Sequence, residues 1–223
     1  MRLYCLANNG PRRLSLLWPV FRSAEKGVKV RSYRVWIVLA AAALGICLAG
    51  EPLTDLLRYD RAAIAQGELW RLLTAHLTHL SLNHAILNLA ALALTAYVSD
   101  GRIPLWHQSL CWLWLFAFTG VLLYLTSPDL SYYVGLSGAL HGALIVAIAF
   151  SPYYSRLVRF GTLAVISAKI VWEQSPFYDD MANADFLGGR VETRAHLYGA
   201  LAGVLWVAVL MAWKHYEQRQ RQH

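Results

Sequence analysis

The sequence predicts an all-α polytopic membrane protein with six transmembrane helices, and three observations lead to this fold class. Of the 223 residues, 57% are hydrophobic and only 15% are charged, which is too apolar for a water-soluble domain of this length. The chain also contains several apolar runs close to the roughly 20 residues that a helix needs to cross about 30 Å of hydrocarbon. Basic residues collect at alternate breaks between these runs, as expected of a chain that crosses a bilayer repeatedly.

Six apolar runs are the candidate spans, and each is bounded by charged, proline or glycine residues. They lie at about residues 35–49, 79–98, 104–125, 135–150, 157–172 and 195–213. We therefore expect one six-helix domain over residues 35–213, preceded by a basic arm at 1–34 and followed by a short tail at 214–223.

The orientation follows from the distribution of charge. Residues 1–34 carry eight lysines and arginines against one acid, Glu25, and the turns after the second and fourth runs carry Arg102, Arg156 and Arg159. The outer turns are instead rich in aspartate and glutamate. Since basic segments stay in the cytoplasm, the sequence predicts that both termini are cytoplasmic.

Polar side chains inside a span are costly, so they indicate a functional site by default. With a rise of 1.5 Å per residue, Ser137, His84 and His196 all fall roughly 10 Å below the outer face. His84 and Asn88 are four residues apart and therefore share one face of their helix. Histidine suits the task of activating a serine, because its unperturbed pKa lies near neutrality.

Two glycine pairs indicate how these helices approach one another. Gly138 and Gly142 lie four apart on the fourth run, and Gly199 and Gly203 lie four apart on the sixth. Small residues at this spacing allow close helix contact in lipid, which would bring the serine and His196 within hydrogen-bond reach. The alternative is that the glycines only reflect ordinary packing in a helical bundle.

Three motifs in order and spacing resemble the rhomboid intramembrane proteases. They are GELWRLLTAHLTHLSLNHAILNL at 67–89, GLSG at 135–138 and AHLYG at 195–199. The resemblance covers the chain from about residue 35 to 213. The closer similarity is to the rhombosortases, a bacterial branch with a compact six-helix rhomboid core and a GLSGxLHG motif, here residues 135–142.

The resemblance implies a serine endopeptidase in which Ser137 is the nucleophile and His196 is the base. It also implies an oxyanion hole formed by His84, Asn88 and the backbone amide of Ser137. We identify no buried acid beside His196, so the expected catalytic unit is a Ser–His dyad.

Further residues are expected to support this site. His141 is expected to pack against or orient His196, with direct action as a base left as an alternative. Trp70 and Arg71, near Glu68, are expected to brace the outer surface. The supporting set is completed by the motif glycines Gly135, Gly138 and Gly199.

No cofactor or metal is expected. The cysteines Cys5, Cys47 and Cys111 have no ligand spacing, and His76 and His79, three apart, lack a third ligand, so second-shell hydrogen bonding is the favoured interpretation. Lys169 lies near the outer end of its run, from where its side chain can extend to the interface.

The expected partners are membrane lipids and membrane-anchored protein substrates, with no nucleic acid. The rhombosortase resemblance implies clients with a C-terminal Gly-Gly, a transmembrane helix and a basic tail, cut in the bacterial inner membrane at a site open to the periplasm. Three alternatives remain: a general rhomboid protease with other single-span clients, a non-catalytic rhomboid-like protein that binds clients, and a small transporter.

Overall fold

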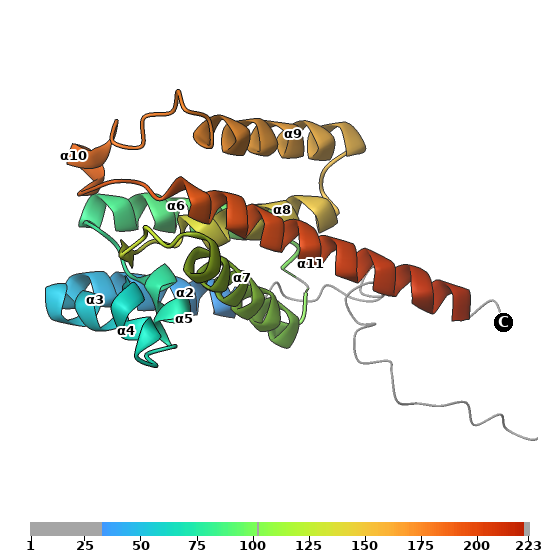
Figure 1. Ribbon diagram of the computed structural model, residues 1–223. Helices are drawn as coiled ribbons and strands as arrows, with labels where there is room; N and C mark the ends of the chain where they lie inside the picture. The colour runs from blue at the N-terminus through green and yellow to red at the C-terminus, as the bar shows by residue number, and fades with distance from the viewer. Residues whose placement is uncertain (1–32, 102, 221–223) are drawn as a thin grey trace, which may run out of the picture.

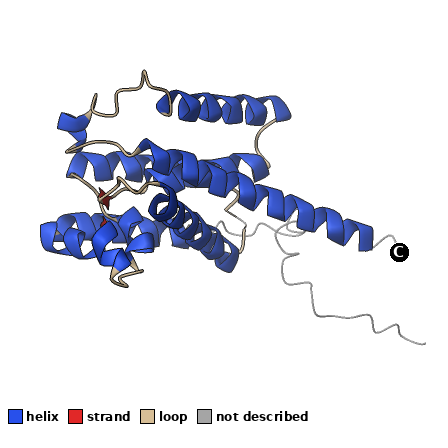
Figure 2. Ribbon diagram, viewed as in Figure 1, coloured by secondary structure: helices blue, strands red, loops and turns tan. Residues whose placement is uncertain are grey.

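The protein is mostly helical, and the computed structural model describes residues 33–101 and 103–220 (Figure 2). The six long helices are α2 (Arg34–Ala49), α6 (Leu82–Val98), α7 (Leu105–Thr126), α8 (Ser137–Phe150), α9 (Arg156–Glu173) and α11 (Thr193–Gln220). Each corresponds to one of the apolar runs predicted from the sequence. Nearly all of the basic N-terminal arm, Arg102 and the last three residues lie outside the described residues.

Only some of these helices are long and apolar enough to cross a membrane unaided. Among the described residues, α7 and α11 meet both conditions. A third span results if the short helices at Arg71–Leu77 are joined with α6, although the two parts meet at an angle of 91°. The helices α2 and α8 are apolar but shorter. The chain is thus a helical membrane protein, and the six-span topology stays a prediction.

The helices α8 and α11 run side by side in close contact (Figure 1). A Cβ added to Gly138 would lie 2.7 Å from the Ala195 carbonyl oxygen, and one added to Gly199 would overlap the Gly138 carbonyl. One turn further along, a Cβ on Gly203 would lie 2.5 Å from the Gly142 carbonyl oxygen. The predicted glycine contact is therefore confirmed, and it brings the N-terminal ends of α8 and α11 together.

Small elements cover the end of the bundle where α8 and α11 begin. They are α3 (Glu51–Leu57), α4 (Arg61–Ala65), α5 (Arg71–Thr74), a 3-10 turn (Ala75–Leu77) and α10 (Ala184–Leu187). A two-stranded antiparallel ribbon joins β1 (Tyr59–Asp60) to β2 (Tyr132–Tyr133), with Tyr59 opposite Tyr133. The second strand ends at Tyr133, four residues before Ser137, so the ribbon fixes the start of the segment that leads into α8.

Arg71 connects several of these small elements, which agrees with the bracing role expected of it. Its side chain is buried, its Nε donates to Glu68 Oε2 at 2.6 Å, and one Nη donates to the carbonyl oxygens of Asp55 and Arg58 at 2.7 and 2.9 Å. The neighbouring Trp70 is instead 46% exposed. Arg71 thus holds the segment between α3 and α5 in place, whereas Trp70 presents an aromatic surface.

Candidate active site

Ser137 is the first residue of α8, and the turn before it depends on glycine. Gly135 has φ +125°, a region that residues with a side chain rarely adopt. The Gly135 amide donates to the Ala75 carbonyl oxygen at 3.1 Å, and the Tyr133 hydroxyl donates to the Gly135 carbonyl oxygen at 2.6 Å. These bonds hold the turn so that the serine stands at a helix N-terminus, where backbone N–H groups lack intrahelical acceptors.

His196 lies in the first turn of α11, and its ring meets Ser137 directly. The distance between His196 Nε2 and Ser137 Oγ is 2.9 Å, and the histidine is only 5% exposed. The close contact of the two helices through Gly138 and Gly199 makes this distance possible. A hydroxyl and an imidazole at this separation form a nucleophile and base pair.

The His84 ring lies near Gly135 and Ser137, whereas Asn88 lies one turn further along α6. The position of a Cβ on Gly135 is 3.2 Å from His84 Nε2 and 3.9 Å from Ser137 Oγ. Ser81 caps α6 by accepting from the His84 amide at 3.2 Å, which fixes the start of the helix. The Asn88 amide is buried and donates to the His84 carbonyl oxygen at 3.0 Å. The structure therefore places the His84 ring near the serine, and Asn88 bonds to the backbone of His84 one turn away.

His141 lies one turn after Ser137 and stacks on the His196 ring. The ring centroids are 4.4 Å apart, with 29° between the planes. His141 Nδ1 is 2.7 Å from the Ser137 carbonyl oxygen, and Nε2 is 2.8 Å from Lys169 Nζ. This arrangement agrees with the predicted packing or orienting role. Within the described residues, no hydrogen bond joins His141 to the Ser137 hydroxyl.

Replacing His141 with phenylalanine should leave measurable activity, because a phenyl ring preserves the stacking on His196 while it loses the polar contacts to Lys169 and Ser137. We expect a loss within about 100-fold, the scale of an orienting group, compared with a complete loss for the serine variant. Initial rates of client cleavage measure this. Activity as low as that of Ser137→Ala would instead assign His141 to the chemistry.

The expectation that no acid lies beside His196 is wrong. Glu173, the last residue of α9, is 6% exposed and places its carboxylate oxygens 3.0 and 2.9 Å from His196 Nδ1. The expected span ends at Trp172, one residue before this acid. The pattern that could have revealed it is Lys169 and Glu173 four apart at the outer end of an apolar helix.

Lys169 makes polar contacts that the sequence analysis does not predict. Its Nζ lies 2.7 Å from Glu173 Oε1 and 2.8 Å from His141 Nε2, although the side chain is 44% exposed. The ammonium group therefore belongs to the same polar cluster as His196. His141, Glu173 and His196 also offer three potential metal-ligand atoms within 4.8 Å of one another, and the lysine donates to two of these three side chains.

The histidines His76 and His79 differ in their hydrogen bonding. His76 Nε2 donates to the Phe116 carbonyl oxygen at 3.1 Å and its Nδ1 is 3.5 Å from the Tyr133 hydroxyl, as the second-shell interpretation predicts. His79 is buried edge-on against His84, with centroids 5.2 Å apart. Neither His79 ring nitrogen has a hydrogen-bond partner within the described residues.

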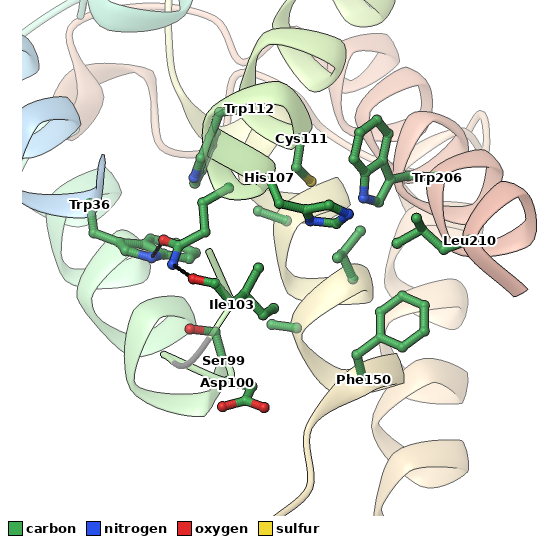
Figure 3. A pocket seen from close by; sticks show the side chains of 14 residues that line it. Trp36, Ser99, Asp100, Ile103, His107, Cys111, Trp112, Phe150, Trp206 and Leu210 are labelled. Carbon is green, nitrogen blue, oxygen red and sulfur yellow. Dashed lines mark hydrogen bonds between the residues drawn. The ribbon is translucent and has the colours of Figure 1, made fainter. Parts of the chain in front are cut away.

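Two of the cavities in the described part of the chain differ in their position relative to Ser137. A cavity of about 640 Å³ opens beside the site, between the segment 79–82, β2 with Val134, and the residues Arg190 and Glu192 before α11. The second, shown in Figure 3, is a largely apolar cavity walled by Trp36, Trp112 and Trp206, with His107 at its centre. Neither lining includes Ser137, His84 or His196, but the first cavity borders the segments that lead into α6, α8 and α11, where these three residues lie.

These features describe a helical membrane protein in which a half-buried serine hydroxyl contacts a buried histidine ring. A model of the rhomboid domain matches residues 66–213, well over half of the chain, and the protein belongs to the rhomboid family. Members of this family are generally intramembrane serine proteases. No curated protein sequence matches the chain.

Proposed function

We propose that this protein is an intramembrane serine endopeptidase, and the contact of 2.9 Å between Ser137 Oγ and His196 Nε2 carries the proposal. The Ser137 oxygen attacks the carbonyl carbon of the scissile peptide bond while its proton passes to His196. The protonated ring then gives this proton to the leaving amine, which leaves an acyl-enzyme that a second nucleophile resolves. His196 is buried and Ser137 is half-buried, which limits competing proton transfer to bulk water.

The negative charge that develops on the substrate oxygen requires hydrogen-bond donors. We assign this role to the Ser137 amide, His84 and Asn88. The position of His84 beside Gly135 and Ser137 supports the assignment, as does the free N–H at the start of α8. Asn88 would act through its second amide hydrogen, since the first is engaged by the His84 carbonyl oxygen. Preorganised donors of this kind are each worth about 3 kcal/mol of transition-state stabilisation.

For the substrate, we propose C-terminally anchored exported proteins that are cut at a Gly-Gly pair just outside their membrane helix, as in rhombosortases. The peptide must leave the helix and extend into the cavity beside the site. Glycine disfavours helix by about 1 kcal/mol relative to alanine and has no side chain to obstruct the approach.

The topology that suits these clients has six spans in the bacterial inner membrane, both termini in the cytoplasm, and the site open to the periplasm. The charge bias in the sequence supports this topology. Charged residues also gather near the start of α11, where Arg194 bonds to Glu192 and Asp129. A client whose basic tail is cytoplasmic then presents the residues outside its helix at the level of the serine.

The client assignment is tested by following a Gly-Gly-anchored exported protein in cells that lack the gene or that carry Ser137→Ala. We expect the protein to retain its C-terminal helix in both strains, whereas complementation with the wild-type gene restores removal. Mass spectrometry of the client C-terminus is the measurement.

Normal removal of the anchor in both strains would reject these clients and leave the general rhomboid protease. Retention of the anchor in the deletion strain but normal removal with Ser137→Ala would instead favour a protein that binds clients without cutting them.

A further inference from the structure

The helix α9 brings a charged pair, with a buried carboxylate and a partly exposed ammonium group, close to His196. Glu173 and Lys169 lie one turn apart and face α8 and α11, and the contact is completed below them by Ile145, Ile166, Ile170 and Ala200. A carboxylate that is almost fully buried in an apolar helix bundle is costly unless it is paired and hydrogen-bonded. Glu173 meets this condition through two partners, His196 and Lys169.

The partners of each nitrogen determine where the protons lie. The Glu173 carboxylate only accepts, so His196 Nδ1 carries a hydrogen and donates it, and Nε2 is left to accept from the Ser137 hydroxyl. The contact of 3.4 Å between Lys169 Nζ and His196 Nδ1 then joins two donors and is not a hydrogen bond.

The same reasoning applies to His141. Its Nδ1 donates to the Ser137 carbonyl oxygen, so its Nε2 accepts from the Lys169 ammonium group, which also donates to Glu173. The resulting chain of bonds starts and ends at the lysine and passes through His141, Ser137, His196 and Glu173. Every donor in this chain meets an acceptor, and the two opposite charges balance.

We propose, on the basis of the proposed proteolytic function, that Glu173 is the third member of a Ser137–His196–Glu173 triad and that Lys169 holds it in place. Both are positioning residues, since neither contacts the serine oxygen. Glu173 fixes the tautomer of His196 that can accept the serine proton, and Lys169 fixes the carboxylate and the stacked His141 ring. The expected dyad is therefore extended by α9.

The proton balance supports this assignment. When Ser137 Oγ bonds to the substrate carbonyl carbon, its proton moves to His196 Nε2 and the carbonyl electron pair becomes the oxyanion. His196 is then a cation whose Nδ1–H faces the Glu173 carboxylate. The carboxylate stays ionised throughout and stabilises that cation until the proton is given to the leaving amine. No additional reactant is needed.

A purely structural alternative is that Glu173 and Lys169 only fasten α9 to the bundle. The chain offers a matched control, because Gln174 is the next residue and its Nε2 donates to the Thr193 carbonyl oxygen at 3.1 Å. Gln174→Ala removes a side-chain bond between the same helix and the start of α11 but does not touch His196. A fastening role predicts similar effects for both positions, whereas a triad does not.

The test compares wild type with Ser137→Ala, Glu173→Ala, Glu173→Gln, Glu173→Asp and Gln174→Ala as purified full-length proteins in detergent. One measurement is the rate of fluorophosphonate labelling, which requires no client, and the other is kcat and KM on a Gly-Gly-anchored client. We expect Glu173→Ala to lower the labelling rate and kcat on the order of 10⁴-fold with KM within about threefold, as for the acid of a triad.

Glu173→Asp keeps the charge and should recover part of the lost rate, Glu173→Gln should fall between Asp and Ala, and Gln174→Ala should match wild type. Melting curves confirm that each compared variant is folded. Folded Glu173→Ala and Glu173→Gln that label at the wild-type rate would overturn the triad. Labelling that also persists in Ser137→Ala would instead reject the proposed function, and labelling without client cleavage would reject only the Gly-Gly substrate.

Discussion

Ser137→Ala and His196→Ala should each abolish cleavage of a co-expressed client. The serine oxygen is the bond-forming atom, and without the ring at 2.9 Å nothing else among the described residues is placed to take its proton. Loss of either member of such a pair lowers kcat by on the order of 10⁶-fold in a soluble serine protease, which is below detection in a membrane assay. Immunoblots of the full-length and cleaved client provide the measurement.

The two variants must remain in the membrane for this result to bear on the chemistry. Both substitutions remove a side chain without adding volume, so membrane fractionation should recover each at the wild-type level. Cleavage that continues in recovered His196→Ala would remove the histidine from its role as base and direct attention to His141, whose ring lies stacked beside it.

Gly199→Ala should unfold the bundle or separate its two catalytic helices. A Cβ at this position overlaps the Gly138 carbonyl, and backbone atoms cannot move aside as a flexible side chain can. Overpacking of this kind usually costs about 1–3 kcal/mol of stability, and separation of α8 from α11 would also lengthen the contact between Ser137 and His196. A lower melting temperature in detergent and lost activity are the expected measurements.

Gly161→Ala is the matched control, since this glycine is also inside a long helix but a Cβ there meets nothing within 4 Å. Alanine favours helix over glycine by about 1 kcal/mol, so the control should be as stable as wild type or more so. Equal melting temperatures for Gly199→Ala and Gly161→Ala would show that α8 and α11 do not depend on the close contact.

The parts of the fold that follow from local pattern could be predicted from the sequence. The apolar run at 35–49 corresponds to α2, and the glycine spacing indicates the contact between α8 and α11. The pairing of Ser137 with His196 follows from the motifs and the estimated depth. Each of these features is predicted by the types and spacing of residues within the helices concerned.

The contribution of α9 could not be predicted in the same way. Glu173 lies 23 residues before His196, and whether an acid at the end of a span faces solvent or the bundle depends on how the helix is rotated. The direction of the Lys169 side chain is equally ambiguous from the sequence, because a long side chain near the interface can extend outward or fold back on its own helix. Only the packing of α9 on α8 and α11 decides between these orientations.

The most direct test of a serine protease centred on Ser137 is to locate the adduct formed by a fluorophosphonate probe. The purified protein is labelled, digested and analysed by peptide mass spectrometry, with His196→Ala and Ser137→Ala treated in parallel. We predict a single adduct on Ser137 in the wild type, strongly reduced labelling in His196→Ala, and none in Ser137→Ala. An adduct on another residue, or undiminished labelling of Ser137→Ala, would contradict the assignment of the nucleophile.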